Sequence, residues 1–534
     1  MGRAVSQFAP GGRCGRHHCQ PHAWHPGSRQ RARQDRYTRQ GPRTIGLRDH
    51  GRRSVAAVFA AGQQLQRADA RSGACAGPDR GLSRVNNPGN GQVTGARGLS
   101  YDDALHSILD SVRDQRTPLE WIALESSLGR ALAQDVTSRL ALPPWDNAGM
   151  DGYAVRRSDV LGASRSVPRV LPVIGTSMAG ADATQLPWVQ AGTALRIMTG
   201  APMPPGADAV VRVEDSDAGE TQVVIHDDRD AQGRGNVRPR GEDVESGQVV
   251  FTAGTSVRAA HLGVLASIGQ RQVPVHRAPR VAMVSSGDEL VLLDDFDAAL
   301  AGQRIVSSSH YALPALLKAA GADVQVRPPV PDTLDALTQA LGEALDDGCD
   351  VLLTTGGVSV GAHDYTREAL ARVGGTQHFW RARIRPGGPI GTGSVRGVPW
   401  IGLPGNPVST LVTATLFAWP LLRTLAGHRA VLPARIPVRV APWLEAPLET
   451  PAPLTYFLRV QLSVGDDGML EAAPAGAQGS NLLRTMALAD ALLMVPETVE
   501  RVMPGSVQQV VLWPEFSLQM PWTSAPLPAQ GVSS

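Results

Sequence analysis

The chain has 534 residues, too many for one hydrophobic core, and its length predicts three or four domains. Hydrophobic residues make up 42% and aromatic residues 4%, which excludes a collagen-like or wholly disordered protein. The net charge of +2 is unevenly spread, because residues 1–98 hold 17 Arg and 4 acidic residues whereas the remainder is acidic. The charge of the remainder therefore predicts no nucleic-acid partner.

The numbers of lysine and cysteine residues exclude further classes of protein. Lys318 is the only lysine, and no Gly-Lys-Ser/Thr string occurs, so a Walker A nucleotide loop is excluded. Beyond residue 98 the only cysteine is Cys349, which rules out an internal disulfide there and fits a reducing compartment. We find neither an uninterrupted apolar run of about 18 residues nor a secretory signal, and expect a cytoplasmic protein with no membrane span.

Residues 1–98 lack helical and strand periodicity, and we predict a disordered, Arg-rich extension. Order is expected to begin at Ser100, where Ser-Tyr-Asp-Asp has the form of a capping box at the start of a helix. A second helix is predicted over 128–134. The following stretch, 140–247, is rich in Gly and Pro with short Val/Ile runs, which indicates a β-rich domain.

From residue 280 buried strands alternate with helices. Strands are predicted at 281–284, 351–353 and 400–403, each followed by a glycine-containing turn. Helices are predicted at 311–320, 332–345, 364–373 and 408–422. This alternation predicts an α/β domain with a parallel sheet covered on both faces. Short strands return after residue 433 and predict a small β domain, followed by a loose tail at 516–534.

The three glycine-containing turns should open at one edge of the sheet, because ligands of parallel sheets bind at the carboxyl ends of the strands. Gly356, Gly357 and Gly361 let backbone N–H groups approach an anion, and Thr355 and Ser359 add hydroxyl donors. A phosphate or another oxyanion fits such turns. The same glycines are equally explained by the turns themselves.

Acidic residues near these turns have two interpretations. Asp288 and Glu289 follow a buried strand and a glycine turn, where carboxylates often handle a metal ion or a proton. Asp332 and Asp364 each precede a predicted helix. Each is therefore either a helix N-cap or a ligand.

Six longer strings occur in one order between residues 99 and 515. They are Asp146–Val155, Arg196–Pro202, Arg240–Asp243, Ser286–Leu290, Thr355–Gly361 with Asp364–Thr366, and Gly402–Ser409. Taken together, they resemble the molybdopterin molybdenumtransferase family, which includes bacterial MoeA and the E domain of gephyrin.

The resemblance implies a multidomain α/β protein that forms a homodimer, with domain II of one subunit facing domain III of the other. The implied parts are a helical linker domain I (99–144 with 248–279), an inserted β-rich domain II (145–247), a three-layer α/β/α molybdopterin-binding domain III with a mainly parallel sheet (280–430), and a small β-barrel-like domain IV (431–515).

The resemblance also implies a reaction: molybdate is inserted into adenylylated molybdopterin and AMP is released, with Mg²⁺ assisting. The implied partners are the molybdopterin adenylyltransferase and the molybdoenzymes. The implied catalytic residues are Asp151, Thr199, Asp243, Glu289, Asp332 and Asp364, the last three as metal ligands. The implied substrate-binding residues are Gly356, Gly357, Ser359, Gly361, Pro404, Gly405, Asn406 and Ser409. The implied molybdate-binding residues are Arg385, Pro389, Arg459 and Ser480.

One departure from the family lies at the implied molybdate site. The family commonly has Lys-Pro-Gly-Lys-Pro, whereas residues 385–389 read Arg-Pro-Gly-Gly-Pro. Arg385 keeps one positive charge, although its planar fork differs from a lysine point charge. Gly388 supplies none, so we expect Arg381, Arg383 or Arg459 to substitute.

Two other functions stay open from the sequence. One is a scaffold that keeps the fold without catalysis. The other is a relative that adenylylates molybdopterin and shares only domain III.

Overall fold

The computed structural model describes residues 98–514 except 233–234, 358–364 and 452. The predicted N-terminal extension, apart from Gly98, and the predicted C-terminal tail lie outside this part. So do three candidate site residues, Ser359, Gly361 and Asp364.

The first helix of the described residues, α2 (Tyr101–Ser111), begins where the sequence predicts. The Ser100 side chain accepts a hydrogen bond from the Asp103 N–H at 3.1 Å, which satisfies one of the unpaired donors of the first turn. Tyr101, Leu105 and Ile108 recur at helical spacing and are buried against the main core.

Two segments, 119–137 and 249–276, form two small antiparallel pairs and one longer helix. The pairs are β1 (Leu119–Ala123) with β11 (Gln272–His276) and β2 (Val136–Thr137) with β10 (Val249–Phe251); the helix is α4 (Ala259–Ser267). The predicted helix over 128–134 is wrong. Ala131 and Leu132 form bridges to Ser256 and Val275, so this stretch completes a strand-like layer instead.

The segment between β2 and β10 folds into a five-stranded sheet of order β7-β4-β6-β5-β8. Its strands are β4 (Gly152–Val155), β5 (Arg169–Ser177), β6 (Ala194–Ile197), β7 (Ala209–Arg212) and β8 (Gln222–Ile225). A two-stranded pair and a short helix accompany it: β3 (Asn147–Ala148), β9 (Val237–Arg238) and α3 (Arg157–Val160). The predicted β-rich region is thus present.

The α/β part is built on a six-stranded sheet of order β15-β12-β16-β20-β19-β17. Its strands are β12 (Arg280–Ser285), β15 (Asp323–Val326), β16 (Val351–Thr355), β17 (Gly375–Arg381), β19 (Pro389–Val395) and β20 (Val398–Leu403). The first four strands in that order are parallel, and β19 runs antiparallel to both of its neighbours.

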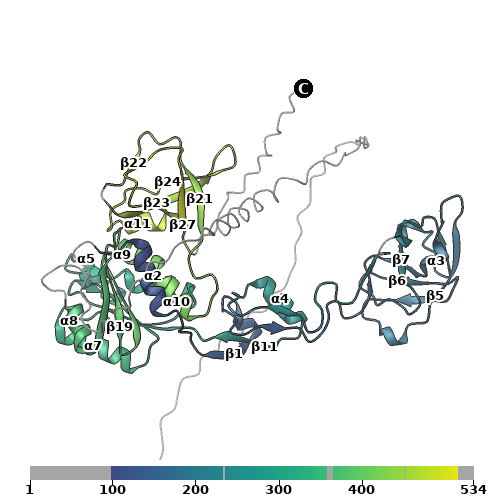
Figure 1. Cartoon of the computed structure of the whole chain (residues 1–534), viewed down its shortest axis with the longest axis horizontal. Coiled ribbons are helices and arrows are strands. Elements are labelled where there is room, and N and C mark those ends of the chain that lie inside the picture. The colour runs from purple at the N-terminus through teal and green to yellow at the C-terminus, as the bar shows by residue number, and fades with distance from the viewer. Residues whose placement is uncertain (1–97, 233–234, 358–364, 452, 515–534) are drawn as a thin grey trace, which may run out of the picture. The chain divides into compact units, whose positions relative to one another are not determined.

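Helices cover both faces of this sheet, as the alternating pattern predicts (Figure 1). They are α6 (Ser309–Ala319), α7 (Leu334–Asp346), α8 (Thr366–Arg372), α9 (Pro407–Thr413) and α10 (Trp419–Leu425). Val281 and Met283 of β12 pack with α2, α6, α9 and α10, whereas Ala282 and Val284 pack with α7 and α8. Successive side chains of a strand point to opposite faces, so one buried strand contributes to the hydrophobic cores on both faces of the sheet.

The stretch Pro407–Leu425 is one continuous helix, with a π-helical turn (Ala414–Ala418) between α9 and α10. Within the described residues it alone is long and apolar enough to cross a membrane. Its most apolar window is 94% buried inside the protein, which is the burial of a core helix.

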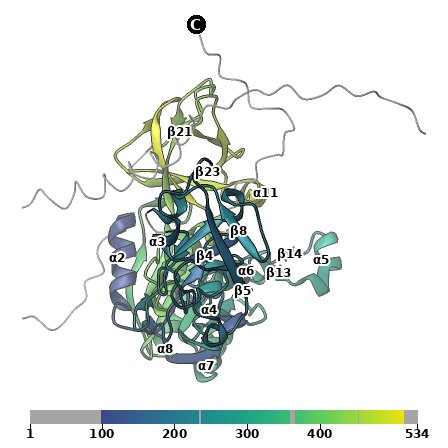
Figure 2. The same cartoon turned by 90° about the vertical axis from the view of Figure 1, so that its right-hand side faces the viewer.

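The segment between β12 and α6, which we call the excursion, folds beside the sheet and not within it. It consists of the parallel pair β13 (Leu290–Val291) and β14 (Ile305–Val306) with α5 (Phe296–Leu300). Figure 2 shows α5 beyond β13 and β14, to the side of α6. The excursion returns the chain to the start of α6, where a row of serines lies.

The C-terminal part is a closed barrel. Its strands are β21 (Arg435–Val440), β23 (Thr455–Val464), β24 (Leu470–Pro474), β25 (Ala491–Val495) and β27 (Val507–Leu512), accompanied by β22 (Leu448–Glu449), β26 (Arg501–Val502) and α11 (Leu483–Ala487). It closes because β23 pairs with both β24 and β25. Strand β18 (Ile384–Arg385), from the α/β part, pairs with β23. The predicted multidomain α/β class with a C-terminal β-barrel is confirmed.

A pH dependence of stability is expected from His428, which follows α10 and is only 5% exposed. Its Nδ1 lies 2.7 Å from the Ser256 hydroxyl, and burial is the main cause that lowers the His428 pKa to about 3. Below pH about 6.5 the unfolded state therefore binds a proton that the folded state does not, so stability falls as the pH falls.

We expect the free energy of unfolding, measured with urea, to fall between pH 7 and pH 5 by about 2 kcal/mol more in the wild-type protein than in the His428→Asn variant. His106→Asn, at an exposed histidine, is the matched control and should behave as wild type. Equal losses in all three proteins would contradict the assignment.

Candidate active site

Three parallel strands end level with one another and place three loops side by side. Ser285 of β12 is opposite Thr355 of β16, which is opposite Leu403 of β20. Gly356 has a φ of 86°, and a Cβ there would lie 2.9 Å from the Ser286 carbonyl oxygen. Glycine is therefore required for both the backbone conformation and the close approach of these loops.

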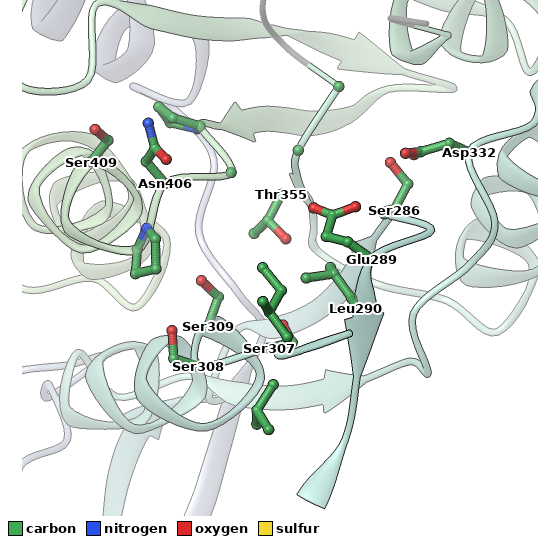
Figure 3. A pocket seen from close by; sticks show the side chains of 18 of the residues that line it. Ser286, Glu289, Leu290, Ser307, Ser308, Ser309, Asp332, Thr355, Asn406 and Ser409 are labelled. Atoms are coloured by element: carbon green, nitrogen blue, oxygen red, sulfur yellow. The ribbon is translucent and has the colours of Figure 1, made fainter. Parts of the chain in front are cut away.

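A cavity of about 460 Å³ opens between these loops and the start of α6 (Figure 3). It brings together most of the sequence-predicted residues of this edge: Glu289, Asp332, Gly356, Gly357, Pro389, Pro404, Gly405, Asn406 and Ser409. In Figure 3, Glu289, Ser286 and Asp332 lie on one side of the cavity and Asn406 and Ser409 on the other. We call it the phosphate cavity.

Glu289 and Asp332 supply the negative charge of the phosphate cavity. Neither carboxylate has an ion pair or a hydrogen bond with a side chain or backbone group in the described part of the chain. Thr333, not Asp332, caps α7, because its Oγ1 accepts from the Ala336 N–H at 3.3 Å. The Asp332 backbone N–H donates to Asp288 Oδ1 at 3.2 Å, which ties the two acidic loops together.

Sequence reasoning missed the hydroxyl-rich side of the phosphate cavity. Ser307, Ser308 and Ser309 line it at the start of α6, where the positive end of the helix dipole favours an anion. Three consecutive serines directly before a helix were the available signal.

A buried histidine holds one of these serines. His310 Nε2 lies 3.1 Å from the Arg327 carbonyl oxygen, which can only accept, so this nitrogen carries the hydrogen. His310 Nδ1 therefore accepts from the Ser307 hydroxyl at 2.8 Å. Burial lowers the His310 pKa and keeps the ring neutral. The Ser307 hydroxyl is thus held in one orientation at the cavity wall.

A second cavity of about 490 Å³ adjoins the first and shares Pro389, Asn406 and Ser409 with it. Arg381, Arg383 and Arg385 line it on one side, and Gln478, Gly479 and Ser480 on the other. Asn406 Nδ2 reaches the Ser480 hydroxyl at 3.4 Å. We call it the oxyanion cavity.

The three arginines of the oxyanion cavity are not equivalent. Arg383 forms a two-pronged ion pair with Glu497, at 2.9 and 3.0 Å, and donates to the Gly98 carbonyl. Glu497 thereby raises the Arg383 pKa and offsets its charge. Arg381 and Arg385 have no carboxylate partner among the described residues; Arg385 lies 5.8 Å from the Tyr456 ring centre. The available positive charge therefore belongs to Arg381 and Arg385.

Arg459 lies behind the cavity wall and not in it. Its side chain is 0% exposed and donates to the Thr485 hydroxyl and to the Ala477 and Gly479 carbonyls, while Nη1 has no hydrogen-bond partner among the described residues. Burial lowers the Arg459 pKa. In the described structure this arginine supports the loop that carries Ser480, and its charge is not neutralised by a carboxylate.

We expect Arg459→Met, which keeps the volume and removes the donors, to lower the free energy of unfolding by about 2 to 4 kcal/mol, because the Thr485 hydroxyl and two partly buried carbonyls lose their partner. Thermal and urea unfolding would measure this. Arg484→Met, at an exposed arginine, is the matched control and should lie within about 0.5 kcal/mol of wild type. A stable Arg459→Met protein would contradict the supporting role.

The glycine that departs from the family pattern sits in a narrow space. A Cβ at Gly388 would lie 3.2 Å from the Ile384 carbonyl oxygen and 3.4 Å from that of Ala382. The Ala382 N–H also donates to the Gly388 carbonyl. A lysine at this position would therefore require these carbonyl groups to move by a few tenths of an ångström.

The remaining candidates lie in the β-rich region. Asp151 Oδ1 accepts from the Thr199 N–H at 2.6 Å and from its hydroxyl at 2.7 Å, and these bonds lower the Asp151 pKa. Asp243 lies near the end of the same region, where its N–H donates to the Leu142 carbonyl. Asp151, Thr199 and Asp243 do not line the phosphate or the oxyanion cavity.

Comparisons with known proteins cover nearly all of the described chain. Family models match at residues 99–269 (MoeA N-terminal region, domain I and II), 282–424 (probable molybdopterin binding domain) and 444–513 (MoeA C-terminal region, domain IV). The chain is 36% identical over 395 residues to molybdopterin molybdenumtransferase 2 of Mycobacterium tuberculosis, covering 73% of this chain and 94% of that protein. It is 32% identical over 428 residues to molybdopterin molybdenumtransferase of Bacillus subtilis, covering 80% and 96%.

A solved structure is similar throughout. The molybdopterin biosynthesis MoeA protein of Pyrococcus horikoshii OT3 matches with a TM-score of 0.66 and 25% identity, covering 78% of this chain and 100% of that one.

Proposed function

The chain belongs to the molybdopterin molybdenumtransferase family as a MoeA-type transferase of molybdenum cofactor biosynthesis, and from this premise we propose that it inserts molybdate into adenylylated molybdopterin and releases AMP. The observation that carries the proposal is the pair of adjoining cavities with opposite charge. Within the described residues, one presents carboxylates that have no partner, together with hydroxyls, and the other presents two arginines without a carboxylate partner.

The phosphate cavity suits the pyrophosphate of the substrate. Gly356, Gly357 and Gly405 leave room for backbone N–H groups to approach phosphate oxygens, and Ser308 and Ser309 at the start of α6 add hydroxyl donors. These groups are built into loops at strand ends, so they bind and orient the phosphates with little rearrangement.

The donor set fits Mg²⁺. Glu289 and Asp332 offer hard carboxylate oxygens, and Mg²⁺ commonly uses one or two carboxylates together with substrate phosphates and water. The described residues hold no group of three or more His, Cys, Asp or Glu side chains for a metal, and the third predicted ligand, Asp364, lies outside them. When bound there, the ion supplies positive charge that offsets the charge of the phosphates during P–O cleavage.

The oxyanion cavity suits molybdate. Arg381 and Arg385 donate charge-assisted hydrogen bonds to its oxygens, and Ser409 and Ser480 add hydroxyls. The buried charge of Arg459 adds positive potential from behind the wall, because no described carboxylate neutralises it. Asn406 and Ser409 belong to both cavities, so molybdate would be held next to the bound phosphates.

We also propose that the protein acts as a cytoplasmic homodimer, in which Asp151, Thr199 and Asp243 of one subunit complete the phosphate cavity of the other. The support is the family membership and the exposed position of the Asp151–Thr199 pair on the β-rich region. The molybdopterin adenylyltransferase and the molybdoenzymes would be its upstream and downstream partners. Light scattering that found an active monomer would contradict the dimer.

The test of the function uses purified protein loaded with adenylylated molybdopterin in the presence of Mg²⁺. Addition of molybdate should release AMP, measured by chromatography, and omission of molybdate should not. Binding of the pterin without molybdate-dependent AMP release would instead support the scaffold function. An adenylylating relative that shares only the α/β part is disfavoured, because the matches extend from residue 99 to residue 513.

A further inference from the structure

Three neighbouring serines line the phosphate cavity at the start of α6, and their hydroxyl groups are not equivalent (Figure 3). The Ser307 hydroxyl lies 2.8 Å from Nδ1 of the buried His310. The Ser308 and Ser309 hydroxyls have no hydrogen-bond partner among the residues that the structure describes. One hydroxyl of the row is therefore engaged inside the protein, and two are available to a ligand.

The surroundings of His310 decide the direction of its bond to Ser307. Nε2 lies 3.1 Å from the Arg327 carbonyl oxygen and 3.3 Å from the Ser285 hydroxyl. Without a hydrogen, Nε2 would turn its lone pair toward those of the carbonyl, and a buried mismatch of this kind costs free energy. Nε2 therefore carries the hydrogen. Because burial lowers the His310 pKa, Nδ1 keeps its lone pair at neutral pH, and the only hydrogen of the Ser307 hydroxyl points at it.

The Ser307 oxygen consequently has only lone pairs to offer the cavity. The oxygens of a fully ionised anion also have only lone pairs, so the two repel each other. Ser308 and Ser309 keep a hydrogen to donate and lie at the positive end of the α6 dipole. An anion at this wall is thus bound by the second and third serines and kept away from the first.

We infer that His310 is a positioning residue, which sets where an anion binds at this wall by making Ser307 an acceptor only. The inference rests on the proposed function, because the phosphate cavity takes its role from it. A ligand group that donates a hydrogen, such as a hydroxyl or an amine, fits beside Ser307 instead. Removal of the His310 ring frees the Ser307 hydrogen, so Ser307 then becomes a further donor to an anion.

The experiment uses sulfate as the probe, because at about pH 8 all of its oxygens are acceptors and no substrate is needed. Calorimetry measures sulfate binding to the full chain without Mg²⁺. All proteins carry Arg381→Ala and Arg385→Ala, which remove the available positive charge of the oxyanion cavity. His310→Leu removes both ring nitrogens, and we expect it to tighten sulfate binding by about tenfold. His378→Leu, at an exposed histidine that lines neither cavity, is the matched control and should change nothing.

Serine variants show which hydroxyl carries the effect. With His310 present, Ser307→Ala should weaken sulfate binding by less than about twofold, because Ser307 donates nothing to the anion. In the His310→Leu protein the same substitution should abolish the gain in affinity. Ser308→Ala combined with Ser309→Ala should weaken binding by at least about fivefold with His310 present. A histidine that only supports the fold would not make one serine substitution depend on it in this way.

Nitrogen-15 NMR of His310 tests the premise without relying on the folding of any histidine variant. We expect the shifts of a protonated Nε2 and an unprotonated Nδ1, and the reverse pattern overturns the inference. Four binding results overturn it too: weaker sulfate binding on Ser307→Ala alone, no gain in folded His310→Leu protein, a gain that survives Ser307→Ala, or no sulfate binding to any of the proteins. All of these leave the proposed function standing, whereas AMP release that does not depend on molybdate would contradict the proposed function itself.

Discussion

Replacing Glu289 with glutamine is expected to slow molybdate-dependent AMP release by roughly 100-fold or more, while the protein stays folded. Glu289 is exposed at the phosphate cavity and has no partner among the described residues, so its charge is available for a cation or for the substrate. Glutamine keeps the shape and removes that charge. Because no native contact is lost, the free energy of unfolding should change by less than about 0.5 kcal/mol.

Single-turnover release of AMP from pre-bound substrate separates this effect from substrate affinity. Glu445→Gln removes the same charge from an exposed position away from the phosphate and oxyanion cavities and should leave the rate unchanged. Raising the Mg²⁺ concentration should partly restore the Glu289→Gln rate if the carboxylate helps to hold the ion. Near-normal release at low Mg²⁺ would remove Glu289 from the catalytic set.

Removal of Arg385 or Arg381 is expected to raise the molybdate concentration for half-maximal AMP release by roughly 10- to 100-fold for each alanine variant. Each arginine can contribute charge-assisted hydrogen bonds, worth about 1.5 to 3 kcal/mol, to an oxyanion that has left water. Neither arginine forms an ion pair with a carboxylate among the described residues. Affinity for the adenylyl end of the substrate should be little changed, because these residues do not line the phosphate cavity.

Two comparisons make this result specific. Arg383→Ala should lower the free energy of unfolding, because Arg383 is paired with Glu497. The molybdate concentration for half-maximal AMP release should change little in this variant. Arg271→Ala, at an exposed arginine outside these cavities, should resemble wild type. If Arg383→Ala alone raised the molybdate requirement, the assignment of charge in the oxyanion cavity would be wrong.

Local sequence signals determined the framework that positions the site. Alternating buried strands and glycine-containing turns predicted the parallel sheet and the edge where the loops meet, since parallel strands present their carboxyl ends together. Ser100 predicted the start of α2, because capping involves only residues within one turn. Glu289 was found in the same way, from a carboxylate that directly follows a buried strand and a turn. The membership of the family rested on strings of this local kind.

Only the tertiary structure decided which polar residues are available. The role of Asp332 was ambiguous in the sequence, because Asp332 and Thr333 are neighbours and either could be the N-cap of α7; the structure shows that Thr333 is the cap. Arg381, Arg383 and Arg459 looked interchangeable, and they differ through contacts with residues far away in the chain, such as Glu497 with Arg383 and Thr485 with Arg459. The oxyanion cavity joins loops from the α/β part and the barrel. Burial and charge pairing are properties of such distant contacts, so residue type and spacing alone do not determine them.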